Sequence, residues 1–388
     1  MKAGLLGRTL GHSLSPQIHR LFGDYEYRLY EKEPDEVGGF LREQLTGPVA
    51  EGRDSTVGLD FLNVTIPYKQ TVFALCDELS PMAKRLGNVN FVTRTADGKL
   101  RGDNTDAFGV ERLLDSVGVD AGGRNCAILG AGGAAMTVKA VLEARGARRV
   151  TFVRRGETPA PDDEIVVNAT PVGMWPYADE VRVDMADYPN CKAVLDLVYN
   201  PSPTRLVREA RACGKTAADG MVMLIAQAYR ASQLASGARH QAPSTLFLYG
   251  PPASGKSTWA KRIAAATGWT RVDLDAEIVA AAGRSIPEIF AAEGEAGFRA
   301  IERACLERVC ARAGGQVVAL GGGALLDPEC RKRAEASGRV VVLDCDLETL
   351  KSRLTGADRP LSADPSKLEK LLAERRPHYA SFPCHVAL

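Results

Sequence analysis

The sequence predicts an α/β protein with two parallel-sheet units in tandem. The first observation is that short apolar runs alternate with helical segments, which is typical of parallel sheets. The second is that two different glycine-rich loops each follow an apolar run and precede a helical segment. The third is the length of 388 residues, because about 150 residues per domain predicts two or three domains.

Seven apolar runs are expected to be strands, and an eighth alternates in polarity up to Pro67. A helical pattern over 220–234 separates two groups of these runs, and the small polar residues that follow it, within 235–244, are the best candidate for a linker. The expected strands are 61–66, 126–130, 149–153, 164–169, 192–199, 245–250, 316–323 and 339–345.

One connection is too short for its expected topology. Only residues 156–164 separate the strand that ends near Arg155 from the strand that begins at Ile165, and they include Pro159 and Pro161. A helical crossover needs about ten to twelve residues, and proline opposes a helix. We therefore expect an extended loop here in place of a helix.

Composition excludes several classes of protein. The chain is 45% hydrophobic and 25% charged with a net charge of +1, which argues against wholesale disorder and against a basic surface for nucleic acid or membrane. The nine cysteines are scattered without CxxC spacing, so neither a disulfide framework nor a zinc site is expected. No signal-peptide core or membrane span is apparent. We expect a folded, soluble, cytoplasmic protein.

The second glycine loop, Gly250–Ser257, reads GPPASGKS between a predicted strand and a predicted helix. Its amides and the helix start can hold nucleotide phosphates, Lys256 adds a positive charge and Ser257 can bind Mg²⁺. Downstream, Asp273 and Asp275 alternate at the end of a predicted strand, although a helix cap is an equally weighted reading. Further signals are Arg299, Glu302, the triplet Gly321–Gly323, Arg359 and Arg375.

With these motifs in this order, residues 245–388 resemble shikimate kinase. The resemblance implies a P-loop fold like that of nucleoside monophosphate kinases, ATP as phosphate donor and Mg²⁺ as cofactor, with Lys256 and Asp275 catalytic and Ser257 and Asp273 at the metal. Members of that family usually continue past the position of Leu388 into another helix. Shikimate is then expected to meet Asp275, Arg299, Gly321, Gly322, Gly323 and Arg375. The expected nucleotide-binding residues are Gly250, Ala253, Ser254, Gly255, Lys256, Ser257, Thr258, Arg353 and Arg359.

The first glycine loop places Gly130, Gly132 and Gly133 between a buried strand and a helix, which indicates a Rossmann-like dinucleotide site. The next strand ends in Arg154 and Arg155. Arginine suits the extra phosphate of NADP, whereas an acidic residue would suit NAD, so we expect NADP(H). The full expected set is Gly130, Ala131, Gly132, Gly133, Ala134, Arg154, Arg155 and Gly220.

Around this loop lie GHSLSP, FLNVTIPYK, GNVNFV, RGDNTDAFG, NATPVGM, DLVYNP and DGMVMLIAQA. Taken alone, Ser13 or Ser15 would read as a helix cap, Lys69 as a solvated charge and Asp106 as another cap. In this order the motifs resemble shikimate dehydrogenase over residues 1–237. The resemblance implies that Lys69 and Asp106 are the catalytic pair. The implied substrate-binding residues are Ser13, Ser15, Asn63, Thr65, Asn90, Tyr199 and Gln227.

The resemblances together imply a bifunctional enzyme. One half would reduce 3-dehydroshikimate to shikimate with NADPH, and the other would phosphorylate shikimate with ATP. The expected division is a catalytic domain of residues 1–105 plus 220–237, a Rossmann-like NADP domain 106–219, a linker 238–244 and the kinase 245–388. Two alternatives stay open: only one half is active, more readily the kinase, or the chain is a metabolite sensor that keeps both pockets.

Overall fold

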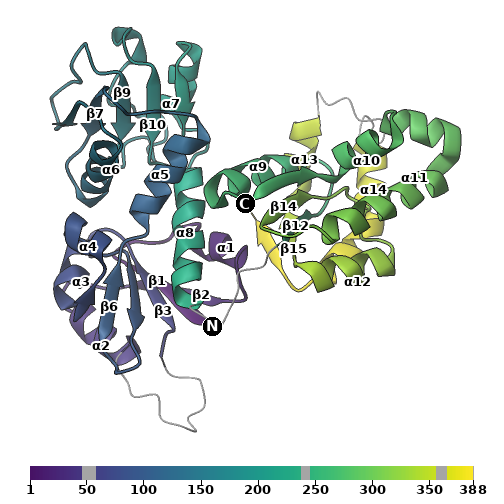
Figure 1. The fold of residues 1–388 in the computed structure, drawn as a ribbon, viewed down its shortest axis with the longest axis horizontal. Coiled ribbons are helices and arrows are strands. Elements are labelled where there is room, and N and C mark those ends of the chain that lie inside the picture. Colours follow the sequence, from purple (N-terminus) through teal and green to yellow (C-terminus); the bar gives the residue numbers. More distant parts are fainter. Residues whose placement is uncertain (46–57, 237–244, 355–364, 388) are drawn as a thin grey trace. The chain divides into compact units, whose positions relative to one another are not determined.

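The computed structural model describes residues 1–45, 58–236, 245–354 and 365–387. The chain forms two compact units, the first mainly residues 1–240 and the second mainly residues 241–388. The first unit contains two sheets and the second contains one (Figure 1). The predicted linker 238–244 lies outside the described residues.

The first sheet has six strands in the order β2-β1-β3-β5-β6-β4. β1 pairs in parallel with β2 and β3, whereas β5 runs antiparallel to both of its neighbours. Its strands are β1 (Lys2–Gly7), β2 (Glu26–Glu31), β3 (Phe61–Val64), β4 (Glu78–Leu79), β5 (Phe91–Arg94) and β6 (Leu100–Asp103). Its helices are α1 (Ser15–Arg20), α2 (Val37–Leu45), α3 (Lys69–Leu75) and α4 (Pro81–Leu86).

The second sheet has five parallel strands in the order β11-β10-β9-β7-β8. This is a doubly wound order with its switch point between β7 and β9, where ligands of such sheets bind beyond the carboxyl ends of the strands. The strands are β7 (Asn125–Leu129), β8 (Arg149–Val153), β9 (Ile165–Asn168), β10 (Ala193–Asp196) and β11 (Thr216–Ala218). The helices are α6 (Gly133–Ala144), α7 (Arg205–Ala212) and the short 3₁₀ helix η1 (Met185–Asp187).

The connection between β8 and β9 contains turns and no helix, which confirms the expected loss of a crossover helix. Arg149 anchors the loop through Asp162 at 2.6 Å and Asp163 at 2.9 Å. Side chains around η1 pack on the sheet in this region, and they join one core with residues of β7, β9 and β10. These η1-segment side chains are Val183, Met185 and Tyr188.

Helices α5 (Asp106–Ser116) and α8 (Met221–Ser236) pack on each other and connect the two sheets of the first unit (Figure 1). Gly109 allows this contact, because a Cβ there would lie 2.8 Å from Cγ and 2.9 Å from the carbonyl oxygen of Met223. Near its C-terminal end α8 contributes Ala231 and Leu234 to the core beside Phe61 of the first sheet. The chain therefore returns to the first sheet through α8.

The second unit is a five-stranded parallel sheet in the order β13-β14-β12-β15-β16. Its strands are β12 (Thr245–Tyr249), β13 (Thr270–Asp273), β14 (Gln316–Ala319), β15 (Arg339–Asp344) and β16 (His385–Ala387). Its helices are α9 (Lys256–Thr267), α10 (Leu274–Ala282), α11 (Ile286–Cys310), α12 (Pro328–Ser337), α13 (Leu347–Leu354) and α14 (Pro365–Ala380). β12 is the central strand, so the loop that follows it opens at a switch point between β12 and β15.

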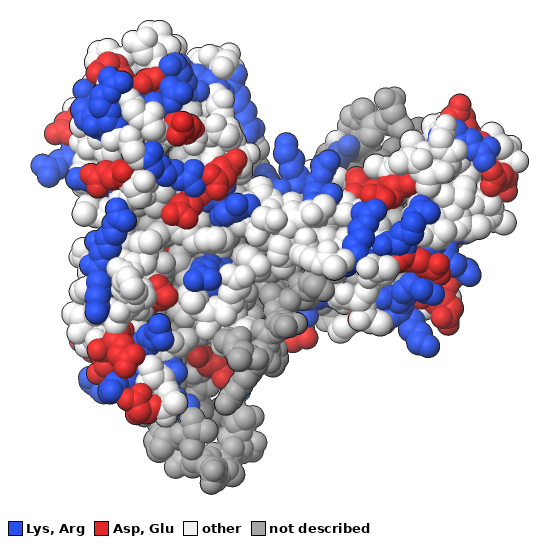
Figure 2. Space-filling model, viewed as in Figure 1, with Lys and Arg blue, Asp and Glu red and all other residues white. Residues whose placement is uncertain are grey.

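Acidic and basic side chains are interspersed over the face seen in Figure 2, in keeping with the net charge of +1. Among the described helices, none is both long and apolar enough to cross a lipid bilayer.

The α5–α8 contact gives a prediction about stability. Gly109→Ala places a methyl group against Met223, and overpacking of this kind lowers the free energy of unfolding by about 1–3 kcal/mol. Gly39→Ala is the matched control, since Gly39 is also helical but has open space around it. Urea unfolding should show Gly109→Ala destabilised and Gly39→Ala unchanged or more stable. Equal effects of the two changes would contradict close packing at Gly109.

Candidate active sites

Lys69 and Asp106 form a partly buried ion pair beside the first sheet, in the segments that follow β3 and β6. The Lys69 Nζ donates to Asp106 Oδ2 at 2.5 Å, and the side chains are 16% and 9% exposed. Lys69 begins α3 just after β3, and Asp106 begins α5 just after β6. The structure thus brings together two residues that the sequence separates by 37 positions.

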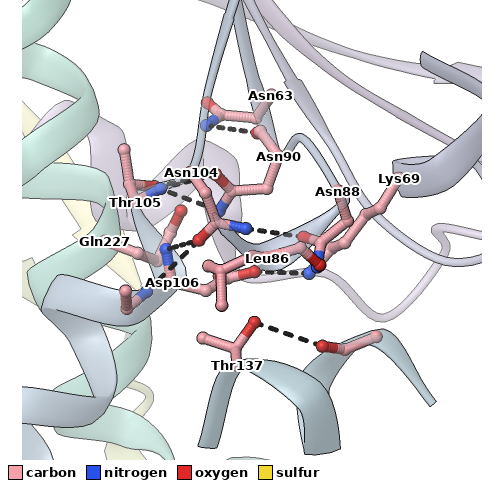
Figure 3. Close-up of polar contacts among 12 residues, drawn as sticks. Asn63, Lys69, Leu86, Asn88, Asn90, Asn104, Thr105, Asp106, Thr137 and Gln227 are labelled. Carbon is pink, nitrogen blue, oxygen red and sulfur yellow. Dashed lines mark hydrogen bonds and ion pairs between the residues drawn. The ribbon is translucent and has the colours of Figure 1, made fainter. Parts of the chain in front are cut away.

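Buried asparagines fix the Asp106 end of this pair (Figure 3). Asn104 Oδ1 accepts the backbone N–H of Asp106 at 3.0 Å and that of Ala107 at 3.3 Å, so it caps the start of α5. The Asn104 amide donates to Asn88 Oδ1 at 2.6 Å. Asn90 accepts the N–H of Thr105 at 2.7 Å. Because Asn104 caps the helix, the Asp106 carboxylate is left to pair with Lys69.

Two serines and a tyrosine gather near the start of α1. Ser13 Oγ donates to Ser15 Oγ at 3.1 Å and accepts the backbone N–H of Ser15 at 3.2 Å. The Tyr199 hydroxyl, which comes from the loop after β10, hydrogen-bonds the Ser13 side chain, and burial raises the pKa of Tyr199. Hydroxyl groups clustered at a helix start suit a carboxylate ligand.

The other expected substrate residues lie at the ends of β3 and β5 and on α8. Asn63 is buried in β3, Thr65 directly follows that strand, and Asn90 precedes β5. Gln227 lies on α8 near Thr105 and Asp106 (Figure 3), and its Nε2 donates to the carbonyl of Leu224 at 2.9 Å.

The first glycine loop lies at the switch point of the second sheet. Gly130 has a φ of +107°, and a Cβ there would approach the Thr170 side chain to 2.9 Å. Gly132 precedes α6 and Gly133 begins it, and a Cβ at either would meet open space. A phosphate could approach this helix start closely. Gly220 differs, because a Cβ there would lie 2.2 Å from the Leu197 carbonyl oxygen, so chain packing already explains this glycine.

Arg154 and Arg155 are exposed directly after β8. A third arginine joins them from the η1 segment: Arg182 donates to the carbonyl oxygens of Val153 at 3.2 Å and Arg154 at 2.6 Å. The Arg154 N–H donates to Glu157 Oε2 at 2.7 Å. Three guanidinium groups at the end of this strand favour an anionic group on the ribose side.

A buried polar network lies on the other side of the switch point. Asp196 accepts hydrogen bonds from Asn168 Nδ2 at 2.9 Å, from the Val198 N–H at 3.0 Å and from the Thr204 hydroxyl at 2.7 Å. Burial raises the pKa of Asp196 to about 6, because these hydrogen bonds only partly offset the cost of desolvating the carboxylate. The network fixes the ends of β9 and β10.

In the second unit the loop Gly250–Ser257 has the backbone of a phosphate loop. Gly250 and Gly255 have φ values of +125° and +93°, and Ala253 between them also has a positive φ. Lys256 is buried and donates to the carbonyls of Gly250 at 2.9 Å and Pro251 at 2.7 Å. Ser254 lies in the loop, and Thr258 follows Ser257 in the first turn of α9.

Carboxylates and arginines converge beside the glycine triplet. Asp273 ends β13 and caps α10, which confirms the helix-cap reading of the two, and Asp275 lies in the first turn of that helix. The hydroxyl of Ser257 donates to Asp273 at 3.1 Å. A Cβ at Gly321 would lie 3.3 Å from Asp275 Oδ1 and 3.2 Å from Glu302 Oε1, which places both carboxylates at this loop.

Arg299 and Arg375 face the same cluster. Arg299 donates to Glu302 at 2.5 Å, and a Cβ at Gly323 would approach its guanidinium to 2.8 Å. Burial raises the pKa of Glu302 while Arg299 opposes that shift, and Arg375 also faces this carboxylate. The structure thus brings together Asp275, Arg299, Arg375 and the glycine triplet.

Arg353 lies on α13 and donates to the carbonyl of Ala253 at 3.4 Å. It borders a cavity of about 1170 Å³ that also includes Pro251 of the phosphate loop. Arg359 lies outside the described residues.

Sequence reasoning missed several residues that fix the sites. Asn88 and Asn104 stand in the quoted motifs, but their contact spans 16 positions. Tyr379 donates to the Gly322 carbonyl at 2.7 Å and hydrogen-bonds Arg375. Its only signal is its place after Arg375 in ERRPHY.

Two family models match the chain. The one described as "Shikimate dehydrogenase substrate binding domain" matches residues 5–92, and the one described as "Shikimate kinase" matches residues 252–387.

Curated relatives of the first part are shikimate dehydrogenases (NADP(+)). The protein from Clostridium perfringens strain SM101 is 34% identical over 259 residues, which are 60% of this chain and 92% of the relative. The protein from Methanopyrus kandleri is 36% identical over 270 residues, covering 60% of this chain and 89% of the relative.

Solved structures give the same comparison. Shikimate 5-dehydrogenase from Thermus thermophilus in complex with NADP(H) and shikimate matches with a TM-score of 0.53 at 29% identity, over 61% of this chain and 94% of that chain. A chorismate mutase/shikimate 5-dehydrogenase fusion protein from Clostridium acetobutylicum matches with a TM-score of 0.54 at 29% identity, over 60% and 90% of the two chains.

Asp196 predicts a pH-dependent stability. Its folded pKa of about 6 lies above the ordinary value of an aspartate, so the folded state binds the proton more tightly and stability falls as the pH rises through the interval between these values. Asp196→Asn should remove this component from unfolding curves measured between about pH 4 and pH 7. Asp187→Asn is the control: Asp187 is exposed, so this variant should retain the pH-dependent component of stability. An unchanged pH dependence in Asp196→Asn would show that Asp196 is charged in both states.

Proposed function

Because the chain belongs to the shikimate dehydrogenase family and carries a shikimate kinase domain in its C-terminal part, we propose that its two halves catalyse consecutive reactions at the residues described above. The first reduces 3-dehydroshikimate to shikimate with NADPH, and the second converts shikimate to shikimate 3-phosphate with ATP. The observation that carries the proposal is that both halves keep reactive groups in contact: Lys69 with Asp106, and Asp275 beside the glycine triplet. A protein that only senses metabolites would need neither the Lys69–Asp106 pair nor Asp275 at this position.

In the reduction, Lys69 is the proton donor. NADPH held by the Gly130–Ala134 loop would supply a hydride to the ketone carbon, which leaves negative charge on the carbonyl oxygen. The Lys69 ammonium stabilises this oxygen and gives it a proton. Asp106 keeps the ammonium oriented before the reaction through their ion pair. Two observations support this role of Lys69: it is paired with one carboxylate, that of Asp106, and its side chain is largely buried.

Substrate recognition is divided between two groups of side chains. Ser13, Ser15 and Tyr199 bind the carboxylate through their hydroxyl groups. The ring hydroxyls are bound by Asn63, Thr65, Asn90 and Gln227. Thr65 directly follows β3, and Gln227 lies near Asp106 (Figure 3). Amide and hydroxyl groups suit neutral hydroxyls because they can both donate and accept hydrogen bonds.

The NADP(H) site of the proposal uses the Gly130–Ala134 loop for the pyrophosphate. The open space at Gly132 and Gly133 and the helix start behind them fit this group. Arg154 and Arg155 bind the 2′-phosphate, and Arg182 holds the backbone between β8 and these arginines in place.

In the kinase half, charge neutralisation and alignment do most of the work that phosphoryl transfer requires. Arg299 and Arg375 bind the carboxylate of shikimate, and Asp275 accepts the proton of the attacking hydroxyl. Glu302 holds Arg299 in place through its ion pair. Lys256 moves from the loop carbonyls to the β and γ phosphates of ATP, and Arg353 contacts the adenine side.

Mg²⁺ fits the oxygen pair of Ser257 and Asp273 at the phosphate loop. Among the described residues, no cluster of three or more His, Cys, Asp or Glu side chains could hold a metal by itself. Substrate phosphates and water would therefore complete the coordination, as is usual for Mg²⁺. The ion neutralises charge on the transferred phosphoryl group.

The proposal also divides the chain into a catalytic domain (1–105 and 220–237), an NADP domain (106–219) and a kinase (245–388).

We place the protein in the cytoplasm. All nine cysteines are free thiols, which suits a reducing compartment.

The two activities should be separable by mutation. The purified chain is assayed with 3-dehydroshikimate, NADPH and Mg-ATP, and NADPH consumption and ADP formation are followed independently. Lys69→Ala should lower the turnover of NADPH by about 10²–10⁴-fold while substrate binding changes far less. It should leave ADP formation from added shikimate intact. Asp275→Asn should lower ADP formation and leave NADPH consumption intact. A wild-type chain that lacks either activity would refute the bifunctional proposal.

Cofactor preference tests the arginine pair. Arg154→Ala combined with Arg155→Ala should raise the KM for NADPH on the order of tenfold or more, because charged hydrogen bonds are lost, and should leave the KM for NADH nearly unchanged. Arg148→Ala is the control, since Arg148 is exposed at the opposite end of β8. A wild-type enzyme that prefers NADH would contradict this assignment.

A further inference from the structure

Tyr27 lies between the two groups of side chains that the proposed function assigns to substrate recognition. It belongs to β2, the edge strand of the first sheet. Its hydroxyl donates to Asn63 Oδ1 at 2.9 Å. The Ser15 side chain hydrogen-bonds the same hydroxyl. One phenol group therefore contacts both a carboxylate-binding residue and a hydroxyl-binding residue.

The contact with Tyr27 fixes which way the Asn63 amide points. Because Oδ1 accepts from Tyr27, the NH₂ group faces the opposite side, where it donates to the carbonyl of Asn90 at 3.4 Å. An NH₂ group has two hydrogens. The second has no hydrogen-bond partner among the described residues, so it remains for an acceptor such as a ligand hydroxyl.

The contact with Ser15 extends the chain of hydrogen bonds in the other direction. Ser15 also contacts Ser13 at 3.1 Å, and Ser13 contacts the Tyr199 hydroxyl. On the Asn63 side, Asn90 donates to the Thr105 hydroxyl at 3.0 Å, next to Asp106. Tyr27 is thus the link in a continuous series of polar contacts from Tyr199 to the start of α5.

The Tyr27 ring has little freedom to move. His19 stacks on it with a centroid separation of 4.3 Å and an interplanar angle of 20°. His19 is fully buried, its ring nitrogens have no hydrogen-bond partner among the described residues, and burial lowers its pKa to about 3. It therefore packs as a neutral aromatic ring at neutral pH. Phe61 lies on another side of Tyr27 at 6.4 Å.

We propose that Tyr27 is a positioning residue for 3-dehydroshikimate, whose hydroxyl keeps the Ser15 side chain in place beside Ser13 and turns the Asn63 NH₂ group toward a ring hydroxyl. The inference rests on the proposed function and adds one residue to the proposed 3-dehydroshikimate site. Tyr27 acts through its two partners and touches neither the reacting carbon nor the proton donor. Its loss should weaken substrate binding more than it slows the chemical step.

The test is Tyr27→Phe in the full chain, which removes the hydroxyl and keeps the ring stacked on His19. We expect the KM for 3-dehydroshikimate to rise roughly three- to tenfold, as for the loss of one or two hydrogen bonds. Turnover should change less, and the KM for NADPH should not change. Tyr30→Phe is the matched control: Tyr30 lies on the same strand, packs on Phe40, and no hydrogen bond of its hydroxyl is seen in the described structure.

A double-mutant cycle with Asn63→Ala separates positioning from a general effect on the fold. If Tyr27 acts through Asn63, Tyr27→Phe should raise the KM much less in the Asn63→Ala background than in the wild type. Additive effects would overturn the proposal, and so would a Tyr27→Phe enzyme that behaves like Tyr30→Phe. Unfolding midpoints report on the folding of the variants. ADP formation from shikimate reports on the kinase half. A wild-type chain that does not reduce 3-dehydroshikimate would overturn the proposed function and, with it, this inference.

Discussion

The packing of α5 against α8 is the contact on which the dehydrogenase half depends. α5 begins with Asp106, and α8 carries Gln227, so the same pair of helices joins two sheets and supplies residues to the proposed substrate site. The absence of a side chain at Gly109 lets the helix backbones approach. A small change in this contact would shift Asp106 relative to Lys69, because Asp106 begins α5 whereas Lys69 begins α3 beside the first sheet.

Much of the architecture could be predicted from sequence because it depends on local patterns. Continuous apolar runs become the buried strands β7, β9, β10, β12 and β14, since strands covered on both faces leave no polar side. Both glycine loops follow such strands. The missing crossover helix was also predictable, because two prolines in nine residues leave no room for it.

Other features depend on contacts that local pattern does not contain. Asp275 lies in a helix because Asp273 caps it, although DxD after a strand reads equally well as a continued strand. Tyr27 and Asn63 are 36 positions apart, and Tyr379 meets Gly322 across 57. Such pairs are set by sheet order and helix packing, and the local sequence around either tyrosine does not indicate its partner.

The segment around η1 has a consequence for how the second sheet forms. In a sheet with a helical crossover, the helix between two strands covers them as soon as both have been synthesised. Here Val183, Met185 and Tyr188 provide that cover, and they follow β9 in the chain. The apolar face of β7 and β9 therefore stays open during synthesis until about 20 further residues have left the ribosome, which raises the contact order of the domain and slows its folding. During that interval a chaperone can bind the exposed apolar face of these strands.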